Sequence, residues 1–479
     1  MTGVNRTPVF AVVGHPNKGK SSVVATLSQN DAIAIALEPG TTRSRQAYPL
    51  TVDGEVLYTL VDTPGFQRPR RVLAWLEAHS ISASDRAETV AAFVQQHRDD
   101  PRFHDECELL TPLIEGAGII YVVDGSVPYS AENEAEMTIL RWTGKPNLAL
   151  VNSIGSDDHS AAWVAALGQF FQVVRRFDAV RAPFDQHLSL LKAFGQLEPG
   201  WEQPLERATL HLSQQRAQRR KDAARLTAQA LEDMLSRRET RTLTANQAAS
   251  LSTETLAEEL RQLWYQYQRQ REQTLRLAVE HLYQHTRITR QEAELTWHNE
   301  HDLFSEDSRQ AWGVSRSYLT TAGFGAGAVG GVSIDALTLG HSLGAGALIG
   351  GLIGAAGSFY YGDRLTLSAL KLGDWHQGLQ TASFGPVQDS QFGYVVLGRA
   401  VDHWWRISQR NHAGRDPLDL EPTESHWLTR LDRASRREIQ RAFDLCRKKR
   451  GLDTASRQRL AHAIEAAFDA YDEWQLNSH

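Results

Sequence analysis

The feature that most constrains this chain is a phosphate loop close to its N-terminus. Residues 14–21 read GHPNKGKS, which is the pattern Gly-x-x-x-x-Gly-Lys-Ser. The apolar residues 9–13 precede the loop, and residues 22–27 continue into a second apolar segment. A buried strand, a glycine loop and a helix N-terminus together direct backbone N–H groups toward a phosphate chain. The context predicts an α/β domain that binds a nucleoside triphosphate with magnesium.

The residue types in the loop suit that task. Gly14 and Gly19 allow the tight backbone path. The Lys20 ammonium is expected to reach the β- and γ-phosphates, and the Ser21 hydroxyl to bind Mg²⁺. The residues that we assign to nucleotide binding in this loop are Gly14, Asn17, Lys18, Gly19, Lys20, Ser21 and Ser22.

A second motif follows the next apolar strand. Residues 56–61 read VLYTLV, and the sequence DTPG comes directly after them, from Asp62 to Gly65. A carboxylate at the end of the strand beside the phosphate-loop strand is a typical place to hold magnesium, and Gly65 can offer its N–H to the γ-phosphate. Residues 40–43, GTTR, lie between the two motifs. A threonine there predicts a switch that closes the magnesium shell only in the triphosphate state.

These three motifs, at these spacings, resemble those of the Era, MnmE and EngA branch of the small GTPases over residues 1–200. The resemblance implies that GTP and GDP are the ligands and that the domain is a P-loop fold with a mostly parallel sheet and helices on both faces. It also implies that Thr42 is the magnesium ligand of switch I, acting with Lys20 in catalysis, and that Asp62 opens switch II. Phe66 follows Gly65, and an apolar residue there is usual in this branch, so we do not assign hydrolysis to it.

The sequence allows two interpretations of Asn17. In relatives of this branch that are activated by potassium, an asparagine at this place helps to coordinate K⁺, which supplies positive charge near the β- and γ-phosphates. Asparagine is also an ordinary loop residue. Mg²⁺ is therefore the expected cofactor, and K⁺ through Asn17 stays open.

The base-recognition motif departs from the branch. The strand at 147–152 should carry Asn-Lys-x-Asp, but the residues after Asn152 are SIG, so the lysine and the aspartate are missing. Loss of these polar groups should relax the selectivity for guanine. We assign the base site to Asn152, Asp178 and Ala179, with Asp157 or Asp158 as a substitute from a shifted loop. GTP is the first expectation, and ATP or mixed specificity stays open.

Charge and cysteine content bear on partners and compartment. The net charge is −6 and the pI is about 6.3, and a chain without an excess of basic residues is not expected to bind nucleic acid. Cys107 and Cys446 are too few and too far apart for a disulfide framework. The first residues show no signal-peptide pattern. We expect a cytoplasmic protein, with association to the inner membrane left open.

Proline placement predicts the domain organisation. Thirteen of the 16 prolines lie at or before Pro204, and none lies between residues 205 and 385, as expected when an α/β domain gives way to long helices. We predict a GTPase domain at 1–200 with helices inserted at about 67–112, a helical bundle region at 201–317, a glycine-rich hairpin at 318–362 and a helical C-terminal region at 363–479. The inserted helices either sense the nucleotide state or cover a sheet edge, and we favour the sheet edge slightly.

The hairpin is predicted from two series of glycines spaced by four residues. The series are Gly323, Gly327, Gly331 and then Gly346, Gly350, Gly354. Small residues at this spacing let two helices approach closely, either in lipid or in a buried soluble core. The sequence favours neither environment, so membrane contact through 318–362 remains one of two alternatives.

Two functional hypotheses follow. In the first, the chain is a nucleotide-dependent switch that binds GTP and hydrolyses it slowly with Mg²⁺, and the all-helical C-terminal region converts the change into association with a protein partner or a membrane. In the second, the chain is a nucleotide-gated scaffold with little hydrolysis and without strict guanine specificity. The sequence identifies no partner and leaves dimerisation open.

Overall fold

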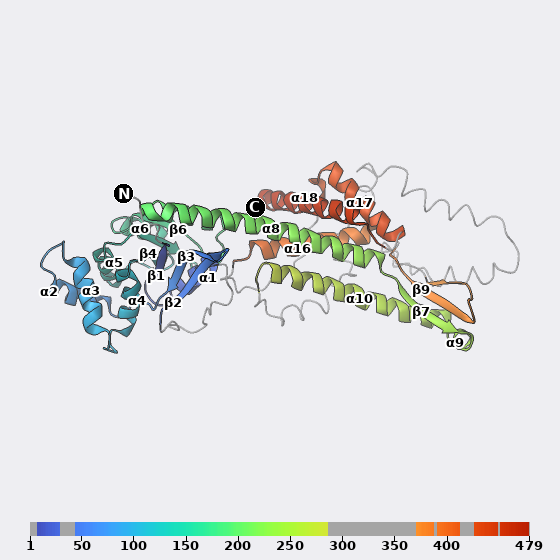
Figure 1. Cartoon of the computed structure of the whole chain (residues 1–479), viewed down its shortest axis with the longest axis horizontal. Helices are drawn as coiled ribbons and strands as arrows, with labels where there is room; N and C mark the ends of the chain where they lie inside the picture. The colour runs from blue at the N-terminus through green and yellow to red at the C-terminus, as the bar shows by residue number, and fades with distance from the viewer. Residues whose placement is uncertain are drawn as a thin grey trace. The chain divides into compact units, whose positions relative to one another are not determined.

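A computed structural model describes residues 7–28, 44–285, 370–387, 390–411, 426–448 and 451–478 (Figure 1). The chain divides into two compact units. The first is built mainly of residues up to Ala217 and the second mainly of residues from Gln218 onward. The division falls inside helix α8 (Glu202–Ser236), which is 35 residues long.

The first unit is organised around a six-stranded sheet with the order β2-β3-β1-β4-β5-β6. The strands are β1 (Val9–Val13), β2 (Gln46–Val52), β3 (Glu55–Asp62), β4 (Gly118–Asp124), β5 (Asn147–Asn152) and β6 (Val173–Arg176). Only β2 is antiparallel to its neighbour, β3. The mostly parallel sheet that the sequence predicts is therefore confirmed. β1 lies between β3 and β4, so the carboxyl ends of these three strands meet at the point where the strand order reverses.

Helices cover both faces of this sheet, which is why β4 and β5 are buried along their whole length. On one face, α1 (Lys20–Ser28), α7 (Phe184–Gly195) and the start of α8 pack with β1 residues such as Phe10. A short 3-10 helix, Pro199–Trp201, joins α7 to α8 and places Trp201 against the Phe10 ring. On the other face lie α5 (Ala131–Trp142) and α6 (Ser160–Leu167).

The interval expected to hold inserted helices contains three. They are α2 (Pro69–His79), α3 (Arg86–His97) and α4 (His104–Ile114). Their apolar residues join Ala11 of β1 and Tyr121 of β4 in one core cluster, and α2 packs on α5. The expectation that they cover a sheet edge is not met: α4 contacts the central strand β1, and α2 and α3 pack mainly on α5 and α4.

The second unit is helical, as predicted. The helices that the structure describes in it are α9 (Ala245–Ser250), α10 (Thr253–Leu282), α16 (Ser390–Gln409), α17 (Arg433–Lys448), α18 (Thr454–Ser478), a 3-10 helix at His426–Thr429 and the later part of α8. Three buried tryptophans, Trp264, Trp404 and Trp427, contribute to its core.

This unit also contains a small sheet that the all-helical expectation did not include. The strands are β7 (Glu239–Thr244), β9 (Leu379–Phe384) and β8 (Leu370–Leu372), paired antiparallel in that order. β7 pairs with a strand more than 130 residues further along the chain. Short strands with such distant partners leave little signal in local periodicity.

Two predicted features lie outside the described residues, namely the switch segment 40–43 with Thr42 and the glycine-rich segment 318–362. Among the helices that the structure does describe, none combines the length and the apolar character needed to cross a membrane.

Candidate functional site

The phosphate loop connects β1 to α1 through an unusual backbone path. Gly14 has φ +142°, Asn17 φ +64° and Gly19 φ +82°. A Cβ on Gly14 would lie 2.4 Å from the carbonyl oxygen of Val122, and one on Gly19 would lie 2.3 Å from Nδ2 of Asn152. Glycine is therefore required at both positions by conformation and by space. Asn17 takes the left-handed conformation that asparagine tolerates better than most residues.

Lys20 is the first residue of α1, and its side chain returns over the loop. Its Nζ donates a hydrogen bond of 3.0 Å to the carbonyl oxygen of His15. The side chain is buried, and burial lowers the pKa of Lys20 from 10.5 to about 8, although the carboxylates of Asp62, Glu136 and Asp105 oppose this shift. The ammonium is thus held, largely desolvated, at the helix N-terminus, where anions are favoured.

The lowered pKa predicts a pH-dependent affinity for nucleotide. Below about pH 8 the Lys20 ammonium is charged, and above it the free protein loses the charge that would meet a phosphate. A bound phosphate raises the pKa again, so binding at higher pH requires uptake of a proton. We expect the Kd for a nucleotide to be about tenfold weaker at pH 9 than at pH 7. Fluorescence titration at pH 7, 8 and 9 with saturating Mg²⁺ measures this. An unchanged Kd, with circular dichroism showing folded protein throughout, would contradict it.

Ser21 and Asp62 meet at the carboxyl end of the central strands. The Ser21 hydroxyl donates a hydrogen bond of 2.7 Å to Asp62 Oδ2, although 41 positions separate the two residues. Asp62 is only 4% exposed and is aligned with Val12 of β1. Thr63, the next residue, also ties the end of β3 to β1, because its hydroxyl donates a hydrogen bond of 2.7 Å to the Val12 carbonyl. The structure thus brings together the two described residues that the sequence assigns to magnesium.

The segment after Asp62 packs directly against the phosphate loop. A Cβ on Gly65 would lie 2.4 Å from the backbone nitrogen of Pro16. The N–H of Phe66 donates to the Gly14 carbonyl at 3.2 Å, and the Phe66 side chain is fully buried in the core that the inserted helices share. Phe66 therefore contributes to packing, and the structure gives no reason to assign it a role in hydrolysis.

The residues assigned to base recognition also meet. Asn152, at the end of β5, donates from Nδ2 to the Lys18 carbonyl at 3.3 Å and accepts at Oδ1 from the Ala179 N–H at 3.1 Å. Thr26 of α1 adds a 2.7 Å hydrogen bond to the Ala179 carbonyl. Asp178 accepts from the N–H groups of Val180 and Arg181, at 2.9 and 3.1 Å, which shapes its own loop. Asn152 thus ties the phosphate loop to the loop after β6.

The two aspartates considered as substitutes for the missing guanine-binding aspartate, Asp157 and Asp158, are both exposed in the loop before α6. Asp158 accepts the N–H of Ser160 at 2.9 Å, at the start of α6, and the hydrogen bonds from Ser160 lower its pKa. Asp157 is exposed, and Gly155 occupies the position of the missing aspartate. Ser22, also assigned to nucleotide binding, lies half-buried in the first turn of α1.

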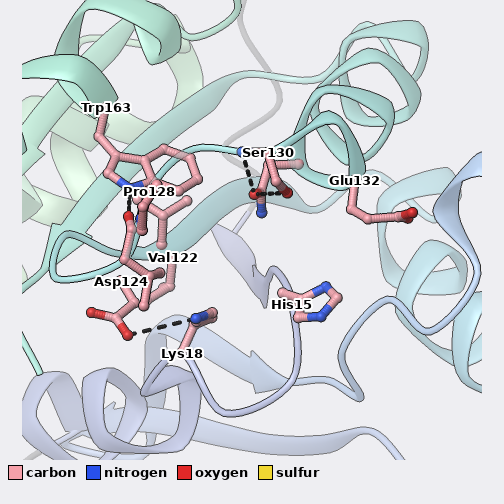
Figure 2. A pocket seen from close by; sticks show the side chains of 11 residues that line it. His15, Lys18, Val122, Asp124, Pro128, Ser130, Glu132 and Trp163 are labelled. Atoms are coloured by element: carbon pink, nitrogen blue, oxygen red, sulfur yellow. Dashed lines mark hydrogen bonds and ion pairs between the residues drawn. The ribbon is translucent and has the colours of Figure 1, made fainter. Parts of the chain in front are cut away.

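A cavity of about 190 Å³ flanks the phosphate loop, and its lining combines Lys18 with residues that the sequence analysis did not assign (Figure 2). The Lys18 ammonium points to Asp124, 3.5 Å from its Oδ2, and Trp163 also lines the cavity. His15 Nδ1 lies 2.7 Å from Glu136 Oε1, a fully buried carboxylate that also accepts the hydroxyl of Tyr121 at 2.8 Å. Asp124 is the last residue of an apolar strand, as Asp62 is, and this position in the sequence could have marked it as a residue of the site. Glu136 lies inside a helix, and no sequence pattern marks it in the same way.

Two protein-family models match the chain. Residues 9–153 match the family described as "50S ribosome-binding GTPase". Residues 165–467, more than half of the chain, match the family described as "Domain of unknown function (DUF3482)". The two matches do not overlap.

Curated proteins and solved structures each resemble part of the chain. GTPase Der of Mycolicibacterium vanbaalenii is 28% identical over 166 residues, which is 34% of this chain and 29% of that protein. A crystal structure of Aquifex aeolicus Era bound to GDP.AlF4- has a TM-score of 0.27 at 18% identity and matches 39% of this chain and 56% of its own. A structure of Era with MgGDPNP and nucleotides 1506-1542 of 16S ribosomal RNA has a TM-score of 0.28 at 17% identity, with the same coverage.

The family-model matches and the match to Der confirm the resemblance stated from the motifs, in that an Era-like GTPase domain precedes a separate helical region. The chain spans less than a third of the Der protein and just over half of each Era chain. The chain therefore belongs to the DUF3482 family, and residues 9–153 form its GTPase domain.

Proposed function

We propose that this protein is a magnesium-dependent switch that binds GTP and hydrolyses it slowly, and whose nucleotide state governs association through the C-terminal region. The observation that carries the proposal is the 2.7 Å contact between the Ser21 hydroxyl and the Asp62 carboxylate, one residue beyond the buried Lys20. This contact joins the end of the phosphate loop to the start of the predicted switch II.

The phosphate end of the nucleotide has the better-defined site. α1 begins at Lys20, so the N–H groups of its first turn and its dipole favour an anion above the loop. The Lys20 ammonium is buried and already partly deprived of water, so a phosphate would compensate a charge that the free protein holds at a cost. Lys20 is therefore the residue that we assign to charge stabilisation during hydrolysis.

The donor set fits magnesium. A hydroxyl and a carboxylate in direct contact are hard oxygen ligands, and Mg²⁺ usually takes few protein ligands and completes its shell with phosphates and water. Ser21 and Asp62 would hold the ion, with Thr42 proposed from the family resemblance alone. When bound, Mg²⁺ would neutralise charge on the β- and γ-phosphates.

GTP is proposed as the nucleotide on the strength of the family match. The Asn152 bridge between Lys18 and Ala179 orders the loops that would enclose a base. With Gly155 at the position of the missing aspartate, we propose that guanine selectivity is weaker than in GTPases with the full motif.

The choice between an enzyme and a scaffold has its own prediction. Asn17 is exposed at the crest of the phosphate loop, where its side chain could help to coordinate K⁺ beside the phosphates. We expect GTP turnover to be about tenfold or more faster in KCl than in NaCl at equal ionic strength. Asn17→Gly removes the side chain and tolerates the left-handed conformation at this position, so it should remove the difference between the two salts without distorting the loop.

Phosphate release measured in the two salts separates the candidates. Equal turnover in both salts would contradict the potassium mechanism and leave a magnesium-dependent enzyme. No turnover in either salt, with GTP bound, would contradict hydrolysis and favour the scaffold. The buried Phe66, which offers no side chain to orient water after Gly65, is the observation that supports the scaffold.

We also propose that the C-terminal region mediates association with a protein partner or a membrane. This proposal rests on the fusion of the GTPase domain to the DUF3482 region in one chain. Membrane contact through 318–362, cytoplasmic placement, dimerisation and the absence of nucleic-acid binding rest on the sequence alone.

A further inference from the structure

We infer that Glu106, on the inserted helix α4, is a positioning residue that couples the segment after Gly65 to the inserted helices. Its carboxylate accepts backbone hydrogen bonds from Gln67 and Arg68, at 3.0 and 2.6 Å to Oε1. These are the first residues after Phe66. The inference rests on the proposed function, because it concerns how the same nucleotide switch is transmitted.

The two N–H groups that Glu106 accepts stand at the start of α2. Pro69 is the first residue of that helix and has no N–H, and the residue before it, Arg68, makes no side-chain capping hydrogen bond. Glu106 therefore supplies from another helix the acceptor and the negative charge that a helix N-terminus favours. A change in the path of residues 65–68 must alter either α2 or its contact with α4.

Glu106 depends on these donors in return. The residue is only 1% exposed, and its second oxygen, Oε2, has no hydrogen-bond partner among the described residues. Burial raises the pKa of Glu106, and the N–H groups of Arg68 and Gln67 act against the rise. A buried carboxylate that lost both donors would be strongly destabilised. Movement of the switch therefore requires α4 to follow or to repack.

The same helix also contacts the chain that follows the predicted switch I residues. The Arg45 N–H donates to Glu108 Oε2 at 3.1 Å, and the Arg45 guanidinium lies 3.9 Å from Glu115, the residue directly after α4. The Phe66 ring, buried with Val72 and Leu110, ties switch II to the core of the insertion. α4 thus contacts the described ends of both switches. The sensing role of the inserted helices, one of the two alternatives that the sequence left open, is the one we propose.

Hydrogen exchange of the full chain, with GDP and then with a non-hydrolysable GTP analogue and Mg²⁺, tests the coupling. In the wild type, peptides covering 66–79 and 104–114 should change protection together when the nucleotide changes. In Glu106→Ala, exchange at 67–72 should be about tenfold faster without nucleotide, and 104–114 should stop responding. The kcat for GTP should fall about tenfold with KM within twofold, because binding is retained and the switch is misplaced.

Two further variants distinguish loss of the coupling from a general loss of structure. Glu106→Gln keeps an oxygen acceptor at the same place, and it should restore most of the coupling even if the alanine variant folds poorly. Glu88→Ala removes an exposed carboxylate from α3 of the same insertion and should behave like the wild type. An unchanged response of 104–114 in Glu106→Ala, or a tenfold rise in KM with kcat unaltered, would overturn the inference. Binding of both nucleotides by the wild type without any response at 104–114 would refute the coupling alone, whereas no binding would refute the proposed function with it.

Discussion

Lys20→Ala should abolish high-affinity nucleotide binding without destabilising the free protein. The ammonium is expected to make charge-assisted hydrogen bonds to two phosphate oxygens, each worth about 1.5–3 kcal/mol. Their loss corresponds to a Kd about 10² to 10⁴ times weaker. The measurement is titration with a fluorescent GTP analogue in the presence of Mg²⁺.

Measuring the stability of the Lys20→Ala variant distinguishes a specific loss of nucleotide binding from misfolding. In the free protein, the fall in the pKa of Lys20 from 10.5 to about 8 corresponds to about 3 kcal/mol of unfavourable free energy. Because the folded pKa lies below the unfolded one, this cost is fully present below pH 8 and fades as the pH rises toward 10.5. At pH 7, Lys20→Ala should therefore unfold at the same denaturant concentration as the wild type or at a higher one. Lys192→Ala, an exposed lysine on α7, is the matched control and should bind nucleotide normally. Full binding by Lys20→Ala would show that phosphates do not lie over the loop.

Asp62→Asn should remove the magnesium dependence of the protein. Asparagine keeps an oxygen that can accept the Ser21 hydroxyl at the 2.7 Å contact, so the local fold should persist. The negative charge that favours a divalent cation is lost. We expect hydrolysis to fall about 10²- to 10³-fold, and Mg²⁺ should no longer strengthen GTP binding. Phosphate release and nucleotide titrations with and without Mg²⁺ measure the two effects.

Asp124→Asn provides the matched comparison. Asp124 ends β4 as Asp62 ends β3, and the two strands flank β1 on opposite sides. Its Oδ2 lies 3.5 Å from the Lys18 ammonium, and its Oδ1 accepts from the backbone and hydroxyl of Ser126. This variant should keep the response to Mg²⁺. If the two variants lost that response equally, the assignment of the magnesium site to Ser21 and Asp62 would be wrong.

The parts of the site that the sequence predicted follow from strand ends and loop geometry. The order of an apolar strand, a glycine loop and a helix strongly restricts the backbone conformation between them. The position of Lys20 at the start of α1 could therefore be predicted. Asp62 could be placed beside the loop because parallel neighbouring strands end at the same edge of a sheet, and the structure puts it 2.7 Å from Ser21.

Other features have no local signature. Glu106 looks like one more acidic residue near the start of a helix, and only the fold shows that its carboxylate reaches the backbone before α2. The inserted helices could be predicted from apolar spacing, but the face they cover depends on strand order, which spacing does not report. The sheet formed by β7, β8 and β9 was missed because its strands are short and pair across a long stretch of chain.

Calorimetric titration of the full chain with GTP, with and without Mg²⁺, tests the central claim most directly, with ATP and XTP as parallel ligands. The proposed switch predicts one site per chain, tighter binding with Mg²⁺ than without it, and a preference for GTP smaller than the full Asn-Lys-x-Asp motif would confer. Failure of all three nucleotides to bind in the presence of Mg²⁺ would contradict a nucleotide switch. Binding that ignores Mg²⁺ would contradict the roles of Ser21 and Asp62 on which the switch depends.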